Sequence, residues 1–572
     1  MGLSKRLLTT SAAAAFTWAT LSGMALAVSL GPCPPLGPVL PAPVRPSADP
    51  DVQAAVKSFE GSLNALTAGY NGSAVSVAVK SIHEDQPFFS FHYTPPHFNT
   101  SGTHKVDADT VYRIASISKL FTLRNLKRQP GDEVNEITTP DWDEITLGSL
   151  ASHQSGLGSD LPIDIAVAPG NYTELGLPAL PDNPGPDCGG TLLLSPCTTS
   201  EFYRDFGKHH PVYAPFTSVV YSNVGIGILA LVIEAVSGKS FDDYIQDAIL
   251  DPLGLTSTFT RRPPSDTKRG FIPEATPDMN WWDADLGPYF SSAGGFYTST
   301  NDILTLGTAI LSSKLLTPAQ TRKWMKPKIA TSSAGLLLGE PWEILRAENV
   351  TGDGRLIEIY TKTGDIWGYD ATFCLVPDYD LVASILTAGF ETGSAAVYKL
   401  CSDAVRELLP ALEKAGKAEA RIAMAGTYAD PATNSTLTLS VDETGPGLKV
   451  TDWIVRGVDV NANYINYANS DGKFIEGVYT PSRLYPSGLK AGGGGGPQQV
   501  SWRAHWDSGT PQQNADIDGD YVWPGFHCIT WAELDRLIYK FNSLDDVVAT
   551  VGDDGVSTSL DLRGFRVQLS RV

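Results

Sequence analysis

Apolar side chains recur along this chain with two different spacings, and their order predicts the architecture. Residues 51–66 have the helical spacing, with apolar side chains at Val52, Val56, Phe59, Leu63 and Leu66. Short apolar runs typical of strands lie at 74–79, 88–93, 356–364, 371–376 and 381–387. Strands that bracket a long, mostly helical middle predict an α/β (α+β) fold, with one antiparallel sheet flanked by helices and an inserted helical subdomain.

The spacing changes after this region. Residues 395–409 again have helical spacing, and Pro410 is expected to end that helix. Beyond residue 421 the apolar positions alternate, as strands require, for example at Leu560 and Leu562. We therefore predict a first domain over residues 51–415 and a separate β-rich domain over residues 422–572.

Several features of the second domain are expected to be structural. Gly564 shifts the phase between two alternating segments, which predicts a bulge there. The glycine-rich residues 491–497 are expected to form a flexible loop. The tryptophans offer a sugar-binding platform as one interpretation, but core packing is favoured for Trp453, Trp502, Trp506, Trp523 and Trp531.

The first residues have the organisation of a secretory signal. Lys5 and Arg6 precede a largely apolar run that ends at the small-residue sequence Ala25-Leu26-Ala27. We predict a signal peptide over residues 1–27 and a Pro-rich lead-in over residues 28–50. A membrane anchor is the alternative, but Thr, Ser and Gly interrupt the run, and no later stretch is long and apolar enough to span a bilayer.

Cysteines and glycosylation sequences agree with a secreted, extracellular protein. Asn-x-Ser/Thr sequences occur at Asn71, Asn99, Asn171, Asn349 and Asn434. The six cysteines fit an oxidising compartment, although they allow several connectivities. The expected pairs are Cys188–Cys197, Cys374–Cys401 and Cys33–Cys528.

Composition and charge disfavour several functions. The 572-residue chain is 42% hydrophobic and 18% charged, which is typical of a globular protein. Its net charge of −21 disfavours binding to nucleic acid. The nine histidines form no His-Glu-x-x-His motif, so no metal is expected.

Candidate chemistry begins at Ser116-Ile117-Ser118-Lys119. On a short helix this spacing places the serine hydroxyl and the lysine ammonium group on one face. A serine needs an adjacent base or charge to become a nucleophile, and a buried lysine with a lowered pKa supplies one. The same spacing occurs in turn-like settings at Ser265, Ser470 and Ser487, so only Ser116 opens an apolar helical run.

Two later motifs complete this candidate site. Tyr221-Ser222-Asn223 precedes the nearly all-apolar residues 224–236, which predicts a buried helix with the tyrosine at its mouth. Lys362-Thr363-Gly364 ends the predicted strand 356–364, where a glycine allows close approach to the backbone. The order and settings of the three motifs favour a functional site over a chance arrangement.

With these motifs the chain resembles the serine β-lactamase-like family, in the branch of class C β-lactamases and D-Ala-D-Ala carboxypeptidases. Residues 150–157, 233–241, 252–255 and 292–297 also resemble family signatures. The likeness covers roughly residues 50–415. The additional β-rich domain and the secretory start are similar to those of secreted fungal β-lactamase-like proteins.

The resemblance implies catalysis through an acyl-enzyme on a small-molecule substrate, with no metal and no cofactor. Ser116 is the implied nucleophile, and Lys119 helps to take its proton. Tyr221, held between two lysines, is the implied base and acid.

The resemblance also implies how the substrate is bound. Asn223 is expected to hold the substrate amide. Lys362, with Thr363, is expected to attract a substrate carboxylate and to lower the pKa of Tyr221. The oxyanion is expected to meet the backbone N–H groups of Ser116 and Asp365, on either side of Gly364.

The sequence departs from the family pattern at two places. Asp365 stands where a small neutral residue is usual, and its carboxylate is expected to repel acidic substrates such as penicillins. After Lys119 the family continues a long buried helix, whereas residues 120–123 of this chain give way at once to the largely polar residues 124–130, which end at Pro130. This segment is expected to be shortened, which lowers the expected stability and activity.

Three functions agree with these observations. The preferred one is a secreted serine hydrolase that acts on an amide, lactam or ester. The alternatives are an acyltransferase of the same fold in secondary-metabolite biosynthesis and a catalytically inactive ligand-binding relative. The hydrolase and the transferase differ in the acceptor of the acyl group, which is water in one and a natural product in the other.

We expect the secreted protein to begin near Val28, to carry N-linked glycans and to have no free reactive thiol. N-terminal sequencing, the mass shift after glycosidase treatment and thiol labelling without reductant measure these three properties. Labelling of several cysteines would contradict the prediction.

Overall fold

The structure, a computed structural model, describes residues 33–121, 137–160, 166, 172–179, 188–189, 195–263, 267–274, 281–469, 481–492, 497–507, 514, 516, 522, 525, 528 and 530–572. Several sequence predictions therefore lie outside the described residues. These are the signal peptide (1–27), most of the segment expected to be shortened (122–130), Asn171, Trp523 and the centre of the glycine-rich loop (493–496).

An antiparallel eight-stranded sheet forms the centre of the first region, in the order β2-β1-β10-β9-β8-β7-β6-β5. Its strands are β1 (Ala74–Ser81), β2 (Phe89–Tyr93), β5 (Ile329–Ala330), β6 (Leu336–Leu338), β7 (Glu343–Ala347), β8 (Ile357–Ile366), β9 (Tyr369–Val376) and β10 (Leu381–Ala388). The sequence predicted both N-terminal strands and the run from β8 to β10, and the predicted fold class is confirmed.

Helices cover both faces of this sheet. α1 (Pro50–Thr67) and α10 (Ser394–Ala423) share a core with Val75, Val77 and Val79 of β1. α8 (Thr300–Leu311) packs on the opposite face, with Ala74 and Ala78 of the same strand. A strand buried on both faces is largely apolar, which explains why residues 74–79 of β1 contain a single polar residue, Ser76.

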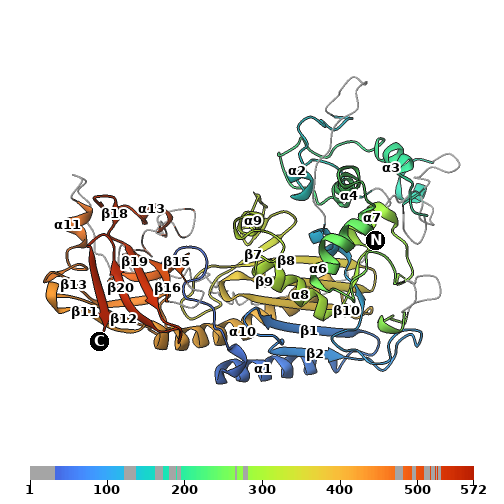
Figure 1. Ribbon diagram of the computed structural model, residues 1–572. Coiled ribbons are helices and arrows are strands. Elements are labelled where there is room, and N and C mark those ends of the chain that lie inside the picture. The colour runs from blue at the N-terminus through green and yellow to red at the C-terminus, as the bar shows by residue number, and fades with distance from the viewer. Residues whose placement is uncertain are drawn as a thin grey trace, which may run out of the picture.

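The helical subdomain lies between β2 and β5 in the chain. Figure 1 shows its helices α2, α3, α4 and α7 on the side of the sheet opposite α1 and α10. Its elements are β3 (Tyr112–Arg113), α2 (Leu147–Ala151), α3 (Thr199–Phe206), α4 (Asn223–Ser237), α5 (Phe241–Ile245), α6 (Asp251–Leu253), α7 (Gly287–Gly294), β4 (Tyr297–Thr298) and α9 (Pro318–Trp324). Its core includes Leu150, Phe202, Val224, Leu229 and Tyr289.

The prediction that Pro410 ends a helix was wrong. α10 continues through Pro410 to Ala423 as one helix of 30 residues. A proline in a helix interior costs about 3 kcal/mol, but Leu408, Leu409 and Leu412 around it are all buried. Burying each leucine contributes roughly 1.5–3 kcal/mol, so tertiary packing outweighs the local preference.

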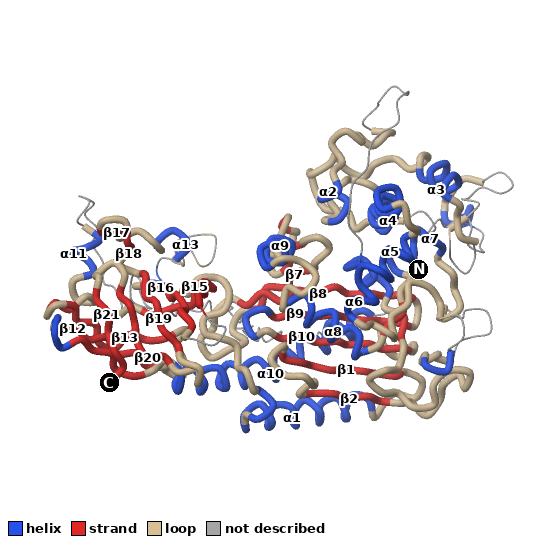
Figure 2. Tube along the Cα trace, viewed as in Figure 1, coloured by secondary structure: helices blue, strands red, loops and turns tan. Residues whose placement is uncertain are grey.

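The second region is a nine-stranded antiparallel sheet in the order β12-β11-β21-β20-β19-β16-β15-β13-β14. An additional pairing of β12 with β13 closes the sheet on itself. Its strands are β11 (Gly426–Asp430), β12 (Ser435–Ser440), β13 (Leu448–Val455), β14 (Val458–Asp459), β15 (Arg483–Gly492), β16 (Gln498–His505), β19 (Asp546–Val551), β20 (Ser557–Leu562) and β21 (Val567–Arg571). Figure 2 shows these strands grouped apart from the first sheet, with α10 reaching towards them.

Small elements complete this region: α11 (Tyr464–Ala468), α13 (Thr530–Glu533), β17 (Ile538–Tyr539) and β18 (Asn542–Ser543). Trp453, Trp502 and Trp506 are buried in the core of the closed sheet, as the favoured interpretation required, whereas Trp531 is 83% exposed. Gly564 lies in the turn between β20 and β21 rather than at a bulge. The expected bulge was therefore wrong, because a hairpin turn shifts the phase of alternation in the same way.

Three disulfides pair the six cysteines as expected. They are Cys33–Cys528, Cys188–Cys197 and Cys374–Cys401. The first joins residues 495 positions apart, and the Cys33 backbone N–H also donates to Asp507 Oδ1 at 3.0 Å. The lead-in thus contacts the C-terminal region before the chain enters α1.

Among the described residues, no single helix has the length and composition to cross a membrane; only α4 and the helical segment Phe241–Leu253, bent by 79°, meet those criteria together.

We expect Trp453→Ala to destabilise the protein by about 3–5 kcal/mol, because truncation of a fully buried aromatic leaves a cavity. The matched control is Trp531→Ala, which removes an exposed ring of the same size and should change stability by less than about 0.5 kcal/mol. Chemical denaturation monitored by circular dichroism measures both. Equal losses for the two variants would contradict the assignment of Trp453 to the core.

Candidate active site

The segment that carries Ser116 is a short 3₁₀ helix, η2 (Ala115–Phe121), which directly follows β3. Ala115 has a φ of 41°, in the left-handed region that costs a non-glycine residue energy. Ser118 holds the turn, because its Oγ donates to Ala115 O at 2.5 Å and accepts from the Phe296 backbone at 3.1 Å. Strained backbone fixed by its surroundings is a common feature of functional sites.

Lys119 is completely buried and directed at Ser116. Its Nζ donates to Ser116 Oγ at 2.9 Å, to Asn223 Oδ1 at 2.5 Å and to the Ala293 carbonyl at 2.6 Å. These three acceptors satisfy all three ammonium donors. Burial lowers the pKa of Lys119, and Lys362 adds to this effect while Tyr221 opposes it. Lys119 therefore contacts the Ser116 hydroxyl and gives up its own proton more readily than an exposed lysine does.

Tyr221 lies between two lysines. The ammonium nitrogens of Lys119 and Lys362 are 4.9 Å and 5.1 Å from the centroid of its ring. Burial raises the pKa of Tyr221, but the two positive charges outweigh burial and hold the pKa below its ordinary value of 10.0. The phenol is thereby biased towards its phenolate form next to Lys119, which also contacts Ser116.

The start of α4 fixes Tyr221 and Asn223. Ser222 caps the helix, since its Oγ accepts from the Gly225 backbone at 2.9 Å. Asn223 Nδ2 donates to Asp160 Oδ1 at 2.7 Å, while its Oδ1 accepts from Lys119. The amide of Asn223 is therefore held at both ends.

His153 is a neighbour of the site that sequence reasoning did not assign. The centroids of its ring and of the Tyr221 ring are 4.5 Å apart, and its Nδ1 accepts from the Ser222 backbone N–H at 3.1 Å. Burial, with Lys119 and Lys362, lowers the pKa of His153 well below its usual value, so the ring is neutral. The sequence signal for this residue was its position within residues 150–157, which resemble a family signature.

Strand β8 contributes the third motif by passing close to η2. A Cβ on Gly364 would overlap the Ile114 carbonyl oxygen and lie 2.8 Å from the Ser116 backbone nitrogen. Only glycine therefore allows this approach. Lys362, in the same strand, is 1% exposed and donates to Thr363 O at 2.8 Å.

Glu343 of β7 was also missed, and it is the ionic partner of Lys362. Its Oε1 lies 2.5 Å from Lys362 Nζ. Burial disfavours the charge of Lys362, but Glu343 and Tyr221 raise its pKa above the ordinary value. Lys362 is therefore a permanent positive charge, in contrast to Lys119. No motif marks Glu343, because only the pairing of β7 with β8 brings it here.

Asp365 lies at the exposed edge of this strand. Its Oδ2 accepts from Ser394 Oγ at 2.5 Å, and it stands opposite Asp370 in the β8–β9 register. Burial and the charge of Asp365 raise the pKa of Asp370 to about 7. The structure thus brings Ser116, Lys119, Tyr221, Asn223, Lys362, Thr363 and Gly364 together, with Asp365 at the rim.

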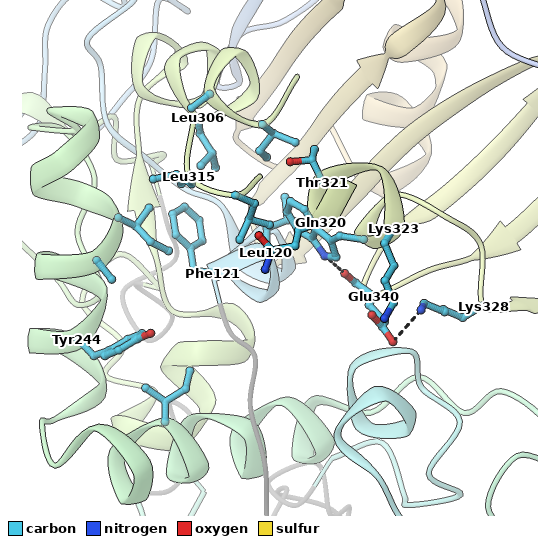
Figure 3. A pocket seen from close by; sticks show the side chains of 17 residues that line it. Leu120, Phe121, Tyr244, Leu306, Leu315, Gln320, Thr321, Lys323, Lys328 and Glu340 are labelled. Atoms are coloured by element: carbon cyan, nitrogen blue, oxygen red, sulfur yellow. Dashed lines mark hydrogen bonds and ion pairs between the residues drawn. The ribbon is translucent and has the colours of Figure 1, made fainter. Parts of the chain in front are cut away.

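An apolar cavity of about 480 Å³ adjoins the end of η2. It is lined by Leu120 and Phe121 together with residues of α5, α8 and α9 (Figure 3). Lys328 and Glu340, 3.5 Å apart, form its polar end. Ser116, Lys119 and Tyr221 are not among the residues that line it, so this cavity is separate from the candidate catalytic groups. Among the described residues, no group of three or more His, Cys, Asp or Glu side chains is arranged to hold a metal ion.

Family models match most of the chain. The model described as beta-lactamase matches residues 63–400, and the model described as the beta-lactamase-like C-terminal domain matches residues 416–572.

Similar proteins carry related names. The "Beta-lactamase-like protein" of Arthroderma benhamiae is 28% identical over 575 residues, covering 94% of this chain and 95% of that protein. "Probable hydrolase clz13" of Cochliobolus lunatus is 25% identical over 430 residues, 68% of each chain. The solved penicillin-binding protein homologue from Pyrococcus abyssi has 16% identity and a TM-score of 0.45, covering 90% of this chain and 99% of that one.

We expect Gly364→Ala to abolish the site without unfolding the protein, because the added methyl group must push β8 away from Ser116. Labelling of Ser116 by a fluorophosphonate, followed by intact mass, should fall at least tenfold. Gly61→Ala is the matched control, since a Cβ there contacts nothing within 4 Å and an alanine favours helix α1. Equal labelling of both variants would refute the close approach of β8.

Proposed function

Because this chain belongs to the β-lactamase family, we propose that it is a serine hydrolase that cleaves an amide, lactam or ester through an acyl-enzyme on Ser116. The observation that carries the proposal is the contact of Ser116 Oγ with a buried lysine, 2.9 Å away, beside a tyrosine held between two ammonium groups. A weak nucleophile, a base and a charge that lowers the pKa of that base are then within one site.

In the proposed reaction, Ser116 Oγ attacks the substrate carbonyl while its proton passes to Tyr221, assisted by Lys119. The bond to the leaving group then breaks, and Tyr221 returns the proton to the departing nitrogen or oxygen. A water molecule then attacks the acyl-enzyme by the same two steps, which releases the acyl group as an acid and restores Ser116. Lys362 keeps the phenolate form of Tyr221 favourable throughout.

The proposed oxyanion site is formed by the backbone N–H groups of Ser116 and Asp365. Its support is the approach of Gly364 to the Ser116 nitrogen, which places the two segments side by side. Donors of this kind contribute roughly 3–4 kcal/mol to transition-state stabilisation. Asn223, held by Lys119 and Asp160, is proposed to receive the acyl side of the substrate.

We also propose that the protein is secreted and consists of a catalytic domain over residues 51–415 followed by a β-rich domain over residues 422–572. Support for secretion comes from the three disulfides, which persist in oxidising compartments. Support for the division comes from the separate cores of the two sheets.

Tyr221→Phe should lower Ser116-dependent turnover roughly a hundred- to ten-thousand-fold, because it keeps the ring but removes the proton-transfer group. Ser116→Ala should cost at least as much, and the double variant little more, since the two side chains act as one unit. Tyr203→Phe, an exposed tyrosine on α3, is the matched control and should retain activity.

The pH profile gives a second readout of the same assignment. Turnover should rise with pH as the base loses its proton, with a midpoint below the ordinary value of 10.0 because the pKa of Tyr221 is lowered. Tyr221→Phe should lose this rising limb. Near wild-type turnover with an unchanged profile would show that Tyr221 is not the base and would leave Lys119 in that role.

A further inference from the structure

Two large aromatic side chains are exposed beside the candidate site. Trp367 lies in the turn that joins β8 to β9, and Phe390 directly follows β10 and Gly389; the two residues are 54% and 52% exposed. The centroids of their rings are 6.5 Å apart, with the rings edge to face. Aromatic rings that contact each other while they face solvent are typical of an interaction surface. These two rings are therefore candidates for contact with a ligand.

The two rings are held in place by the backbones that carry them. The Gly389 backbone N–H donates to the Gly368 carbonyl at 2.8 Å, which joins the segment after β10 to the β8–β9 turn. A Cβ on Gly368 would lie 3.1 Å from the Phe390 ring, so this ring packs closely over the glycine. Groups that are fixed before a ligand arrives lose less conformational freedom on binding.

A carboxylate lies beside the rings. Asp365 is exposed, stands two residues before Trp367, and accepts from Ser394 Oγ through its Oδ2 at 2.5 Å. Within the described parts of the chain, no Lys, Arg or His forms an ion pair with Asp365, and Lys362 of the same strand is paired with Glu343. Aromatic faces within about 6 Å of a cation, together with a carboxylate, are the groups that recognise alkylammonium ions. The chemistry of this rim therefore fits a positive group.

These groups lie within reach of the reacting atoms. β8 approaches η2 at Gly364, where a Cβ would lie 2.8 Å from the Ser116 backbone nitrogen. Asp365 is the next residue, and Trp367 is three residues beyond Gly364, at most about 10 Å along an extended strand. A substrate whose carbonyl carbon is bonded to Ser116 can therefore place another of its groups between Asp365 and the two rings.

We infer that Asp365, Trp367 and Phe390 form a subsite for an alkylammonium group of the substrate, so that the protein prefers amides or esters that carry such a group near the scissile bond. This inference rests on the proposed serine hydrolase function and adds the class of substrate to it. The backbone N–H of Asp365 keeps its proposed place in the oxyanion site, while its side chain binds the positive charge.

The test uses the full-length protein and two isosteric esters, acetylcholine and 3,3-dimethylbutyl acetate, which differ by a positive nitrogen in place of a carbon. The values of kcat/KM are divided by the rate of spontaneous hydrolysis of each ester. They are measured in about 0.5 M sodium chloride, because salt screens attraction to the net charge of −21. The wild-type protein should prefer acetylcholine at least tenfold. Equal values, or a preference for the neutral ester, overturn the inference.

Two variants assign this preference to particular groups. Asp365→Asn removes the charge but keeps the backbone N–H, and it should reduce the preference at least tenfold. Trp367→Leu keeps an apolar side chain but removes the ring, and it should reduce the preference at least threefold. An unchanged ratio in Asp365→Asn overturns the inference, and an unchanged ratio in Trp367→Leu overturns the contribution of the rings.

The matched controls are Asp85→Asn and Trp531→Leu. Asp85 is exposed in the loop between β1 and β2, at the end of the sheet remote from the β8–β9 turn. Trp531 is exposed in the second region. Both controls should keep the wild-type ratio. A loss in Asp85→Asn as large as that in Asp365→Asn would show that overall charge determines the preference, which overturns the subsite.

If Asp365→Asn does not fold, or if neither ester is hydrolysed, protection of Ser116 decides the matter. 2-(Trimethylammonio)ethylboronic acid should protect Ser116 from fluorophosphonate labelling at least tenfold better than 3,3-dimethylbutylboronic acid, and Trp367→Leu should reduce this difference. Equal protection or the reverse order overturns the inference. A wild-type protein that hydrolyses neither ester and is not labelled at Ser116 instead overturns the proposed hydrolase function itself.

Discussion

The burial of two lysines around one tyrosine is the constraint on which the candidate site depends. Lys119 is surrounded by neutral acceptors, so burial lowers its pKa, whereas Lys362 has the Glu343 carboxylate and keeps its charge. Each ammonium nitrogen lies about 5 Å from the centroid of the phenol ring, and two unit charges at such a separation interact by on the order of 3 kcal/mol at an effective dielectric constant of 20. Tyr221 is 40% exposed, so water screens part of this attraction. The remainder still exceeds the effect of burial, which is why the pKa of Tyr221 falls.

Three distant segments must meet to build this arrangement, and each is held by a different device. η2 is fixed by Ser118 and by an alanine in the left-handed region. The start of α4 is fixed by the Ser222 cap and by His153. β8 reaches η2 only because residue 364 lacks a side chain. The chemistry therefore depends on backbone geometry as much as on the reactive groups.

Strands β1, β2 and β8 to β10 and the site motifs were predictable from sequence because each depends on local or short-range patterns, whereas the short strands β3 to β7 were not predicted. β1 and β10 are buried on both faces and are largely apolar, and the three motifs have distinctive order and setting. Pro410 misled the prediction because packing around α10 outweighs a local preference. Glu343 escaped notice because strand register, which places it beside Lys362, cannot be derived from the residues around it.

Helix α10 contacts both the candidate site in the first region and the sheet of the second region. Near its start, Ser394 binds Asp365 and Tyr398 binds Glu343, so the helix supports the rim of the candidate site. In its second half, Glu413 forms a buried ion pair with Lys417, whose Nζ also donates to the Glu443 carbonyl beyond β12 at 2.9 Å. The ion pair lies within the helix, and the hydrogen bond from Lys417 to Glu443 is the contact that links the end of the helix to the second region. The packing that carries the helix through Pro410 therefore also keeps the site rim and the C-terminal sheet on one continuous support.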